Sequence, residues 1–205
     1  MEQGSEDWFK VRRGVPTASH FRDILADSDE RKMRTNYLYN LAGERLSGLT
    51  AEDFTNEYMN RGKRMEPQAL ASYEMLNAVE IERVGFVKRG RVGCSPDGLV
   101  GAAGAIETKT MAPKLLIPII LKKPPPPNEH LPQCHGVTWI CELDWCDLSL
   151  FWPGMRPTVY RINRDEDFLR YLAGECDRFC DDLDNLVYKL RGDPQKMLHE
   201  MELPR

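Results

Sequence analysis

The chain has 205 residues, of which 41% are hydrophobic and 29% are charged, and its formal net charge is −4. These values are ordinary for a globular protein with one sizeable core, so we expect a single domain. The acidic balance argues against a protein that coats nucleic acid without specificity, but local basic clusters and bound metal still allow contacts with phosphate.

The sequence also indicates where the protein is located and whether its cysteines form bonds or bind metal. The acidic, polar N-terminus does not resemble a signal peptide, and the longest apolar run, Leu115–Leu121, is too short to span a bilayer. The six cysteines include no C-x-x-C pair, so reduced thiols are a simpler expectation than a zinc site. We therefore expect a cytoplasmic protein, in a bacterial or phage-infected cell, with no membrane segment.

The first eighty residues are predicted to be mainly helical. Trp8 and Phe9 lie in a predicted short turn, and the first helix is expected to begin near Ala18. Apolar residues at helical spacing predict a second helix over about 34–46 and a third helical stretch over about 55–79.

The middle of the chain changes to short segments typical of strands. Their ranges are 81–87, 91–94, 99–100 and 105–110. Because glycines punctuate these segments, they predict an antiparallel meander. After a proline-rich stretch we expect a helix, a strand pair and a long C-terminal helix. These later elements are predicted to begin near Leu131 and to cover 147–152, 158–163 and 165–190.

Residues 111–132 interrupt every periodic pattern, because prolines recur throughout them and four stand together at Pro124–Pro127. Proline removes a backbone donor and disfavours helix and strand interiors, so we predict a long irregular loop. Such a loop is either functional or mobile. The polyproline run can instead serve as a rigid spacer or as a docking segment for another protein, and the sequence leaves these interpretations open.

Acidic residues and a lysine lie on two neighbouring predicted strands. Asp97 stands where one strand begins, and the next strand carries Glu107 and Lys109 on one face because strand side chains alternate. Thr108 points to the opposite face and leaves its backbone carbonyl free to face the acids. Such carboxylate and carbonyl oxygens suit Mg²⁺, and a nearby lysine stabilises the charge that builds up in phosphodiester cleavage.

Simpler interpretations compete with this predicted metal site. The same acids and lysine can belong to a surface hairpin with an ordinary ion pair, although apolar neighbours favour the edge of the core. Glu66 lies in register with a helical apolar stripe, so its carboxylate needs a partner. That partner is either the metal–phosphate site or a salt bridge to Lys63 or Arg64.

These pieces, in this order, resemble the lambda-exonuclease (YqaJ-type) branch of the restriction-endonuclease-like nucleases. The matching stretches are Trp8, Arg12-x-Gly14-Val15-x-Thr17-Ala18-Ser19, Arg61-Gly62-Lys63 with Glu66, Ser95-Pro96-Asp97-Gly98-Leu99, Glu107-x-Lys109 and Gln133. They span residues 8–133, and the ordered set is far more specific than any single piece. The family tends to carry a further acid ahead of the Asp97 strand, where this chain reads Lys88-Arg89-Gly90.

The resemblance implies an α/β (α+β) fold in which helices flank a central mixed sheet, within one domain over 1–205. A helical part would occupy about 1–80, the catalytic sheet about 81–163 and the C-terminal helix about 165–190. The resemblance also implies a processive 5′-to-3′ exonuclease that degrades one strand of linear double-stranded DNA. It would act as a homotrimer around the DNA. It would leave 3′ single-stranded tails for phage-type recombination, and a single-strand annealing protein would bind these tails.

The resemblance further assigns roles to the metal site and the attacking water. Mg²⁺ ions, two in number and replaceable by Mn²⁺, would be held by Asp97, Glu107, Glu66 and the Thr108 carbonyl. Lys109 and Gln133 would position and activate the water. These roles follow from the family and not from the spacing of the residues.

Phosphate contacts are implied for Arg12, Ser19 and Ser95, with Arg12 anchoring a 5′ phosphate. Either serine can instead cap a helix or stabilise a turn. Three other functions remain possible on the sequence alone. They are an endonuclease of the same fold, a non-catalytic DNA-binding recombination scaffold, and a protein-interaction module that uses the polyproline segment.

Overall fold

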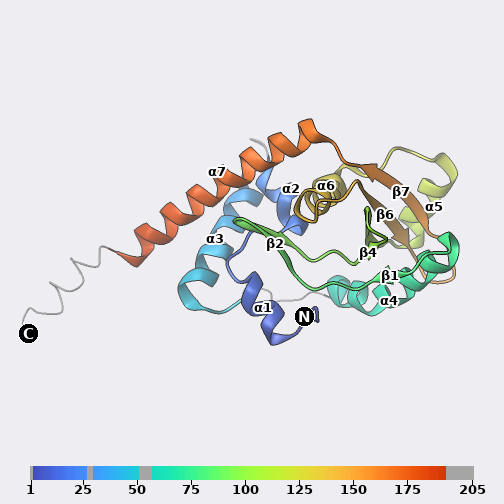
Figure 1. Cartoon of the computed structure of the whole chain (residues 1–205), viewed down its shortest axis with the longest axis horizontal. Coiled ribbons are helices and arrows are strands. Elements are labelled where there is room, and N and C mark those ends of the chain that lie inside the picture. The colour runs from blue at the N-terminus through green and yellow to red at the C-terminus, as the bar shows by residue number, and fades with distance from the viewer. Residues whose placement is uncertain (1, 27–29, 51–56, 193–205) are drawn as a thin grey trace, which may run out of the picture.

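The strands of the protein form one mixed sheet and one small ribbon. The computed structural model in Figure 1 describes residues 2–26, 30–50 and 57–192. The five-stranded sheet has the order β1 (Ile81–Glu82), β4 (Gly98–Val100), β5 (Gly104–Thr110), β6 (Trp145–Phe151) and β7 (Thr158–Asn163). The ribbon pairs β2 (Val87–Arg89) with β3 (Val92–Cys94).

Helices lie on both sides of the main sheet. Within the described ranges they are α1 (Glu6–Arg12), α2 (Phe21–Ile24), α3 (Arg31–Ser47), α4 (Glu57–Asn77), α5 (Pro113–Lys122), α6 (Leu131–Ile140) and α7 (Glu166–Arg191), with 3-10 helices η1 (Ala18–His20) and η3 (Asn128–His130). Figure 1 shows α7 beside α3 and α2 on one side of the strands, and α4 on the other. The predicted α/β fold, a central mixed sheet flanked by helices, is confirmed. No helix in these ranges combines the length and the apolar character needed to cross a membrane.

The sheet is mixed because β5 and β6 are parallel, whereas the other neighbouring strands are antiparallel. A parallel pair requires a crossover connection, and α5 and α6 provide it here. All of β6 except its first residue is buried, as expected for a strand covered on both faces. The crossover places α6 next to β5, on which the predicted catalytic acid lies.

The predicted antiparallel meander over 81–110 is only partly correct. β1 pairs with β4, and the chain between them leaves the main sheet to form the β2–β3 ribbon. The Gly93 N–H donates to the Pro16 carbonyl at 3.0 Å, so β3 lies against the N-terminal segment. This contact joins residues far apart in sequence, so no pattern of neighbouring residues predicts it. The chain then returns to the main sheet at Asp97.

The N-terminal turn predicted around Trp8 and Phe9 is a helix instead. The Ser5 hydroxyl accepts the Trp8 N–H at 3.3 Å and caps α1, and Glu6 and Asp7 occupy its first turn. A capping serine and acidic residues both stabilise a helix N-terminus. The capping signal was therefore present in the sequence and was not recognised.

The irregular loop predicted over 111–132 is wrong for residues 113–122, which form α5. Pro113 occupies the first turn, where the missing N–H has no helical partner to lose. Pro118 lies inside the helix on its exposed side and removes one backbone hydrogen bond without preventing the turn. Lys123 ends the helix in a left-handed conformation, with φ of 46°.

Apolar residues cover both faces of the sheet. Ala105 and Ile106 are neighbours on β5 and both are fully buried, and successive strand side chains point to opposite faces. Ala105 belongs to the larger cluster, in which α6 packs on the sheet and α2, α3 and α7 pack around α6 and one another. Ile106 belongs to a smaller cluster beneath α4 that includes Leu70 and Tyr73.

A buried polar contact joins α4 to the sheet. The Tyr73 hydroxyl donates to Asp147 Oδ2 at 2.7 Å, and Arg161 donates to both Asp147 oxygens at 2.9 and 3.0 Å. Asp147 is 3% exposed, so its charge requires these partners. The Arg161 guanidinium also lies 3.7 Å from the centroid of the Trp145 ring. The contact fixes the position of α4, the helix that carries Glu66.

Replacing Phe179 with alanine should lower the free energy of unfolding by about 3–5 kcal/mol. The Phe179 ring on α7 is fully buried and stacks on Tyr37 of α3, with ring centroids 5.4 Å apart. Chemical denaturation followed by circular dichroism measures the change. Tyr188→Ala is the matched control because Tyr188 lies on the same helix and is 69% exposed; it should alter stability by less than about 0.5 kcal/mol. Equal losses would contradict the core assignment of Phe179.

Candidate active site

The start of β4 brings Asp97 next to Thr108 of β5. The Thr108 N–H donates to Asp97 Oδ2 at 2.6 Å, and the Thr108 hydroxyl donates to the same oxygen at 2.8 Å. We expected the Thr108 side chain to point away, but Asp97 lies just outside the last residue pair of β4 and β5 and the hydroxyl reaches it. The N–H and C=O of an extended residue point to the same edge, so the Thr108 carbonyl also faces this acid.

Glu107 is the buried acid of the site, with 1% of its surface exposed. Its Oε2 accepts the Gln133 amide at 2.5 Å and lies 3.5 Å from Lys109 Nζ. Its Oε1 is buried without any hydrogen-bond partner among the described residues. A buried carboxylate oxygen without a partner carries a large desolvation cost, so this atom is suited to a cation or an ordered water.

Burial and mutual repulsion shift the titration of the acids. Burial, and then the charge of Asp97, raise the pKa of Glu107 well above its ordinary value. The same two causes raise the pKa of Glu66. Burial lowers the pKa of Lys109, but the charges of Glu107 and Asp97 raise it by more, so the side chain remains an ammonium. Burial and proximity therefore make the charged forms of these acids costly, and a divalent cation bound between them would lower that cost.

Glu66 lies on α4, away from the Glu107 side of the site. Its carboxylate accepts Arg83 at 2.6 Å and is partly exposed. The sequence offered a salt bridge to Lys63 or Arg64 as an alternative. For Arg64 this prediction is wrong, and the Lys63 side chain lies outside the described residues. The partner comes instead from the segment after β1, which the α4 packing brings close.

Two cavities meet at Asp97 and Lys109, which line both of them. The smaller cavity, of about 190 Å³, is lined by Gln3, Trp8, Arg12, Thr17, Ala18, Ser19, Cys94, Ser95, Glu107 and Gln133. The larger cavity, of about 690 Å³, is lined by Arg61, Gly62, Glu66, Thr108, Thr110, Met111, Ala112, Lys114, Leu115, Glu129 and His130. The tertiary structure thus gathers all nine predicted site residues around one junction, with Glu66 only in the larger cavity.

Polar contacts connect the predicted phosphate residues within the smaller cavity. The Arg12 guanidinium lies 3.8 Å from the centroid of the Trp8 ring, and the Trp8 indole N–H donates to Ser95 Oγ at 2.9 Å. Ser19 Oγ lies 3.1 Å from Thr17 Oγ1. These residues come from three segments of the chain, so the cavity exists only in the folded protein.

Helix α3 holds the segment that carries Arg12 in place. The Gly14 N–H donates to Glu44 Oε2 at 2.8 Å, and Arg45 Nε donates to the Gly14 carbonyl at 2.7 Å. The Thr17 N–H donates to the Tyr37 hydroxyl at 2.9 Å. Sequence reasoning missed this support, although Glu44 follows Tyr37 by seven residues and so lies on one helical face with it. The argument that singled out Glu66 applies equally to Glu44.

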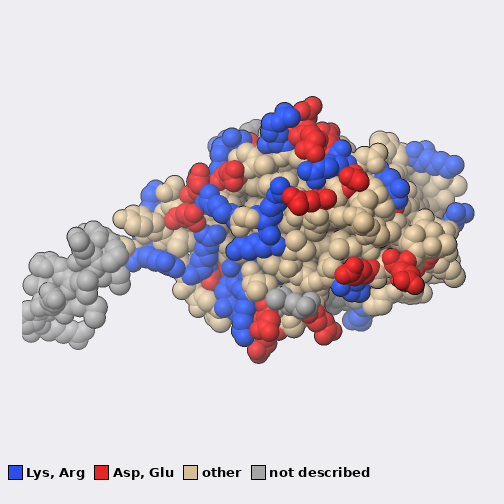
Figure 2. Space-filling view, in the orientation of Figure 1, with Lys and Arg blue, Asp and Glu red and all other residues tan. Residues whose placement is uncertain are grey.

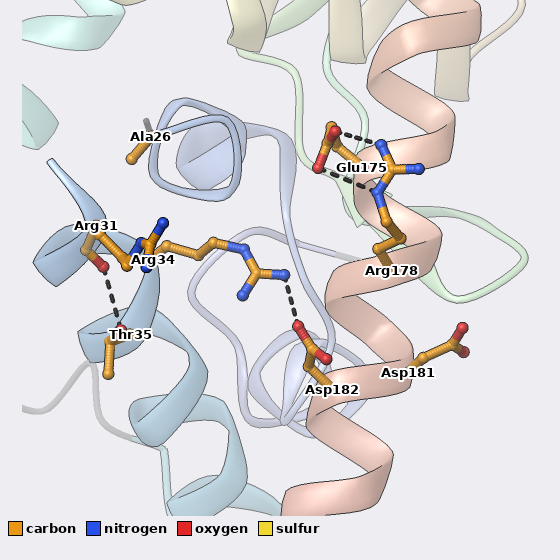
Figure 3. A pocket seen from close by; sticks show the side chains of 8 residues that line it. All are labelled: Ala26, Arg31, Arg34, Thr35, Glu175, Arg178, Asp181 and Asp182. Carbon is orange, nitrogen blue, oxygen red and sulfur yellow. Dashed lines mark hydrogen bonds and ion pairs between the residues drawn. The ribbon is translucent and has the colours of Figure 1, made fainter. Parts of the chain in front are cut away.

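Several arginines outside the two cavities form ion pairs with acidic residues of α7. Figure 2 shows basic and acidic side chains interleaved over the face that carries α7. A further hollow of about 660 Å³ lies between α3 and α7. In Figure 3, Arg34 points to Asp182, 2.7 Å away, and Arg178 points to Glu175. Arg34 and Arg178, two of the three arginines that line the hollow, already have acidic partners, so the hollow is a weaker candidate for phosphate than the two cavities.

Two acids and a lysine at neighbouring strands of a mixed sheet, beside cavities lined by arginines and serines, define the site of a nuclease. The family described as YqaJ-like viral recombinase domain matches residues 7–144. Because the match covers more than half of the chain, the protein belongs to this family. No curated protein matches the chain.

Solved structures agree with this assignment. An alkaline exonuclease, LHK-Exo, from Laribacter hongkongensis is 28% identical, with a TM-score of 0.83 over 94% of this chain and 100% of that chain. A structure of LHK-Exo in complex with dAMP matches equally well. A phage related exonuclease from Haemophilus somnus 129PT is 15% identical, with a TM-score of 0.65 over 86% of this chain and 96% of that chain, and shares the fold. The predicted YqaJ-type exonuclease assignment is therefore confirmed.

Glu107→Gln should stabilise the protein in EDTA by an amount that grows as the pH rises. The pKa of folded Glu107 lies above its ordinary value. The bound proton therefore contributes to the free energy of unfolding. This contribution is fully present below the pKa of Glu107 in the unfolded chain, and it is lost as the pH rises through the pKa of Glu107 in the folded protein. Glutamine does not titrate and avoids this loss.

Thermal melts of the wild type and the variant at about pH 5 and about pH 8 measure the difference. Glu80→Gln, at an exposed position, is the matched control and should show no such trend. A stabilisation by Glu107→Gln that shrinks or stays constant toward alkaline pH would contradict the raised pKa of this acid.

Proposed function

We propose that the protein is a Mg²⁺-dependent exonuclease that degrades one strand of linear duplex DNA in the 5′-to-3′ direction. The observation that carries the proposal is the buried Glu107 Oε1, which has no partner among the described residues. Glu107 lines the smaller cavity together with Asp97 and Lys109, at which the two cavities meet. The named relatives are exonucleases, and a phosphodiester at this junction would contact the acids and Lys109. Strand polarity, duplex preference and the 3′ single-stranded tails rest on the family.

Asp97, Glu107 and the Thr108 carbonyl are the residues that would hold Mg²⁺, with Glu66 assisting from the larger cavity. Within the described part of the chain, no three acidic, histidine or cysteine side chains form a complete metal site. Mg²⁺ usually keeps water and phosphate oxygens among its ligands, so an incomplete protein set fits it. When bound, one or two such ions, or Mn²⁺ in their place, would activate water and stabilise the departing oxygen.

The protein's own groups would hold the water and the phosphate. Lys109 remains an ammonium because the neighbouring acids raise its pKa, so it can donate to the attacking water or to a phosphate oxygen. The Gln133 amide donates to Glu107 and would hold that carboxylate in one orientation as its charge changes. Both residues would thereby position the reacting atoms.

The smaller cavity is the proposed place of the DNA end. Arg12, Ser19 and Ser95 line it together, and a guanidinium with two hydroxyls suits a terminal 5′ phosphate. The larger cavity would receive the rest of the duplex. Its lining includes Arg61, Lys109 and Lys114, which can contact the DNA backbone.

Assembly and partners are proposed from the family. A homotrimer around the DNA would keep an acidic protein on its substrate, and a single-strand annealing protein would receive the 3′ tails. Helix α5 exposes Leu115, Ile117, Ile120 and Leu121, and a cluster of exposed apolar side chains is typical of a surface that another protein covers. A cytoplasmic location in a bacterium or phage-infected cell belongs to the same proposal.

An endonuclease and a non-catalytic scaffold are the competing functions. Covalently closed circular DNA separates the endonuclease from the proposal, because an exonuclease leaves it intact and an endonuclease nicks it. Linear duplex labelled at either end, incubated with Mg²⁺ or EDTA, tests polarity and metal dependence together. A scaffold would release no label under either condition.

Lys109→Ala should lower the rate of cleavage of linear duplex DNA by at least about 10²–10³-fold, because the variant lacks the ammonium beside Glu107. Release of labelled nucleotide measures the rate, and a cooperative thermal transition shows that the variant folds. Lys189→Ala, at an exposed position near the end of α7, should cleave at the wild-type rate. Undiminished turnover by Lys109→Ala would remove this residue from the mechanism.

Arg12→Ala should reduce the preference for 5′-phosphorylated over 5′-hydroxyl ends by about 10–100-fold, the factor expected for one or two charge-assisted hydrogen bonds. The ratio of kcat/KM for the two kinds of end measures this preference. Arg170→Ala, at an exposed position on α7, is the matched control. An unchanged ratio in Arg12→Ala would contradict the assignment of the 5′ phosphate to the smaller cavity.

A further inference from the structure

The side chain of Gln3 fastens the N-terminal segment over the active site. Gln3 Nε2 donates to the Val84 carbonyl at 2.8 Å and to the Pro96 carbonyl at 2.9 Å. One amide group thus bridges the segment after β1 and the residue directly before Asp97. Both contacts join positions more than eighty residues apart in sequence, so they exist only in the folded chain.

The fastened segment forms one side of the smaller cavity. Gln3, Trp8 and Arg12 all line it, opposite Ser95 and other residues of the site. Trp8 is 6% exposed and donates to Ser95, so it holds the middle of the segment, while Gln3 holds its beginning. We refer to residues 3–12 as the N-terminal wall.

The two cavities differ in the length of DNA that they can accept. The smaller one measures about 190 Å³ and the larger one about 690 Å³, and pockets that enclose drug-sized ligands measure roughly 300–1,000 Å³. The smaller cavity is therefore limited to about one nucleotide or less. A strand that crosses Asp97 and Lys109 can continue into the larger cavity, whereas the smaller one has room for only a short piece of it.

We propose that the N-terminal wall, fastened by Gln3, determines how many nucleotides lie beyond the cut bond, and so makes the enzyme release mononucleotides and require a free end. This inference rests on the proposed exonuclease function and adds a specificity-determining residue to it. Gln3 acts through the wall and is a positioning residue. Its two hydrogen bonds go to the backbone carbonyls of Val84 and Pro96.

Gln3→Ala removes both hydrogen bonds and should loosen the wall. We expect the fraction of 5′-labelled product longer than one nucleotide to rise about tenfold, the factor that one to two ordinary hydrogen bonds represent. A duplex closed by hairpins at both ends, which offers no free end, should also become a substrate. The total rate of bond cleavage on ordinary linear duplex should change much less than the product length.

Gln3→Glu is the second variant, because it keeps the size of the side chain but places an acceptor opposite two carbonyl oxygens. It should lengthen the products at least as much as Gln3→Ala. Gln68→Ala, at an exposed position on α4, is the matched control and should release mononucleotides like the wild type. Thermal melts of all variants establish that the core remains folded, since Gln3 lies outside both apolar clusters.

The outcomes separate this inference from the proposed function. If the wild-type enzyme with Mg²⁺ releases no mononucleotide from either labelled end, the exonuclease proposal fails. If the wild type releases mononucleotides and both folded Gln3 variants do the same, while hairpin-closed duplex stays intact, only the role of the wall is overturned. Longer products from the Gln3 variants alone would support it.

Discussion

The active site depends on the burial of one carboxylate. Glu107 is almost inaccessible to solvent, and only one of its two oxygens has a hydrogen-bond partner among the described residues. Burying an acid in this way costs free energy and favours its protonated form. A divalent cation at the free oxygen would offset that cost. The group whose burial weakens the folded protein is therefore the one that we propose binds metal, a relation often seen between stability and activity.

Polar contacts from three helices orient the site around this carboxylate. α4 is joined to the sheet through Tyr73 and Asp147, α3 holds the Arg12 segment through Glu44 and Gly14, and α6 presents Gln133 to Glu107. Apolar packing sets the distance between elements, but it is not directional. Hydrogen bonds with buried partners add the direction that a catalytic arrangement requires.

Prediction from the sequence succeeded where a local pattern was sufficient. The alternation of side chains along a strand placed Glu107 and Lys109 on one face, and Lys109 Nζ lies 3.5 Å from Glu107 Oε2. It did not find partners that are distant in sequence, such as Arg83, which pairs with Glu66 where Arg64 on the same helix was one of the expected alternatives. The prolines of residues 113–122 were also misjudged, because Pro113 sits at the one part of a helix that tolerates it.

The sequence by itself determined the family, the α/β fold and the set of acidic, basic and amide side chains, because these are recorded in ordered motifs and in the periodicity of apolar residues. Only the tertiary structure decided that Glu107 is buried with one oxygen that has no partner among the described residues, that two cavities meet at Asp97 and Lys109, and that Gln3 lines one of them. Burial, cavity size and long-range hydrogen bonds arise when distant segments pack together, and no local pattern encodes them.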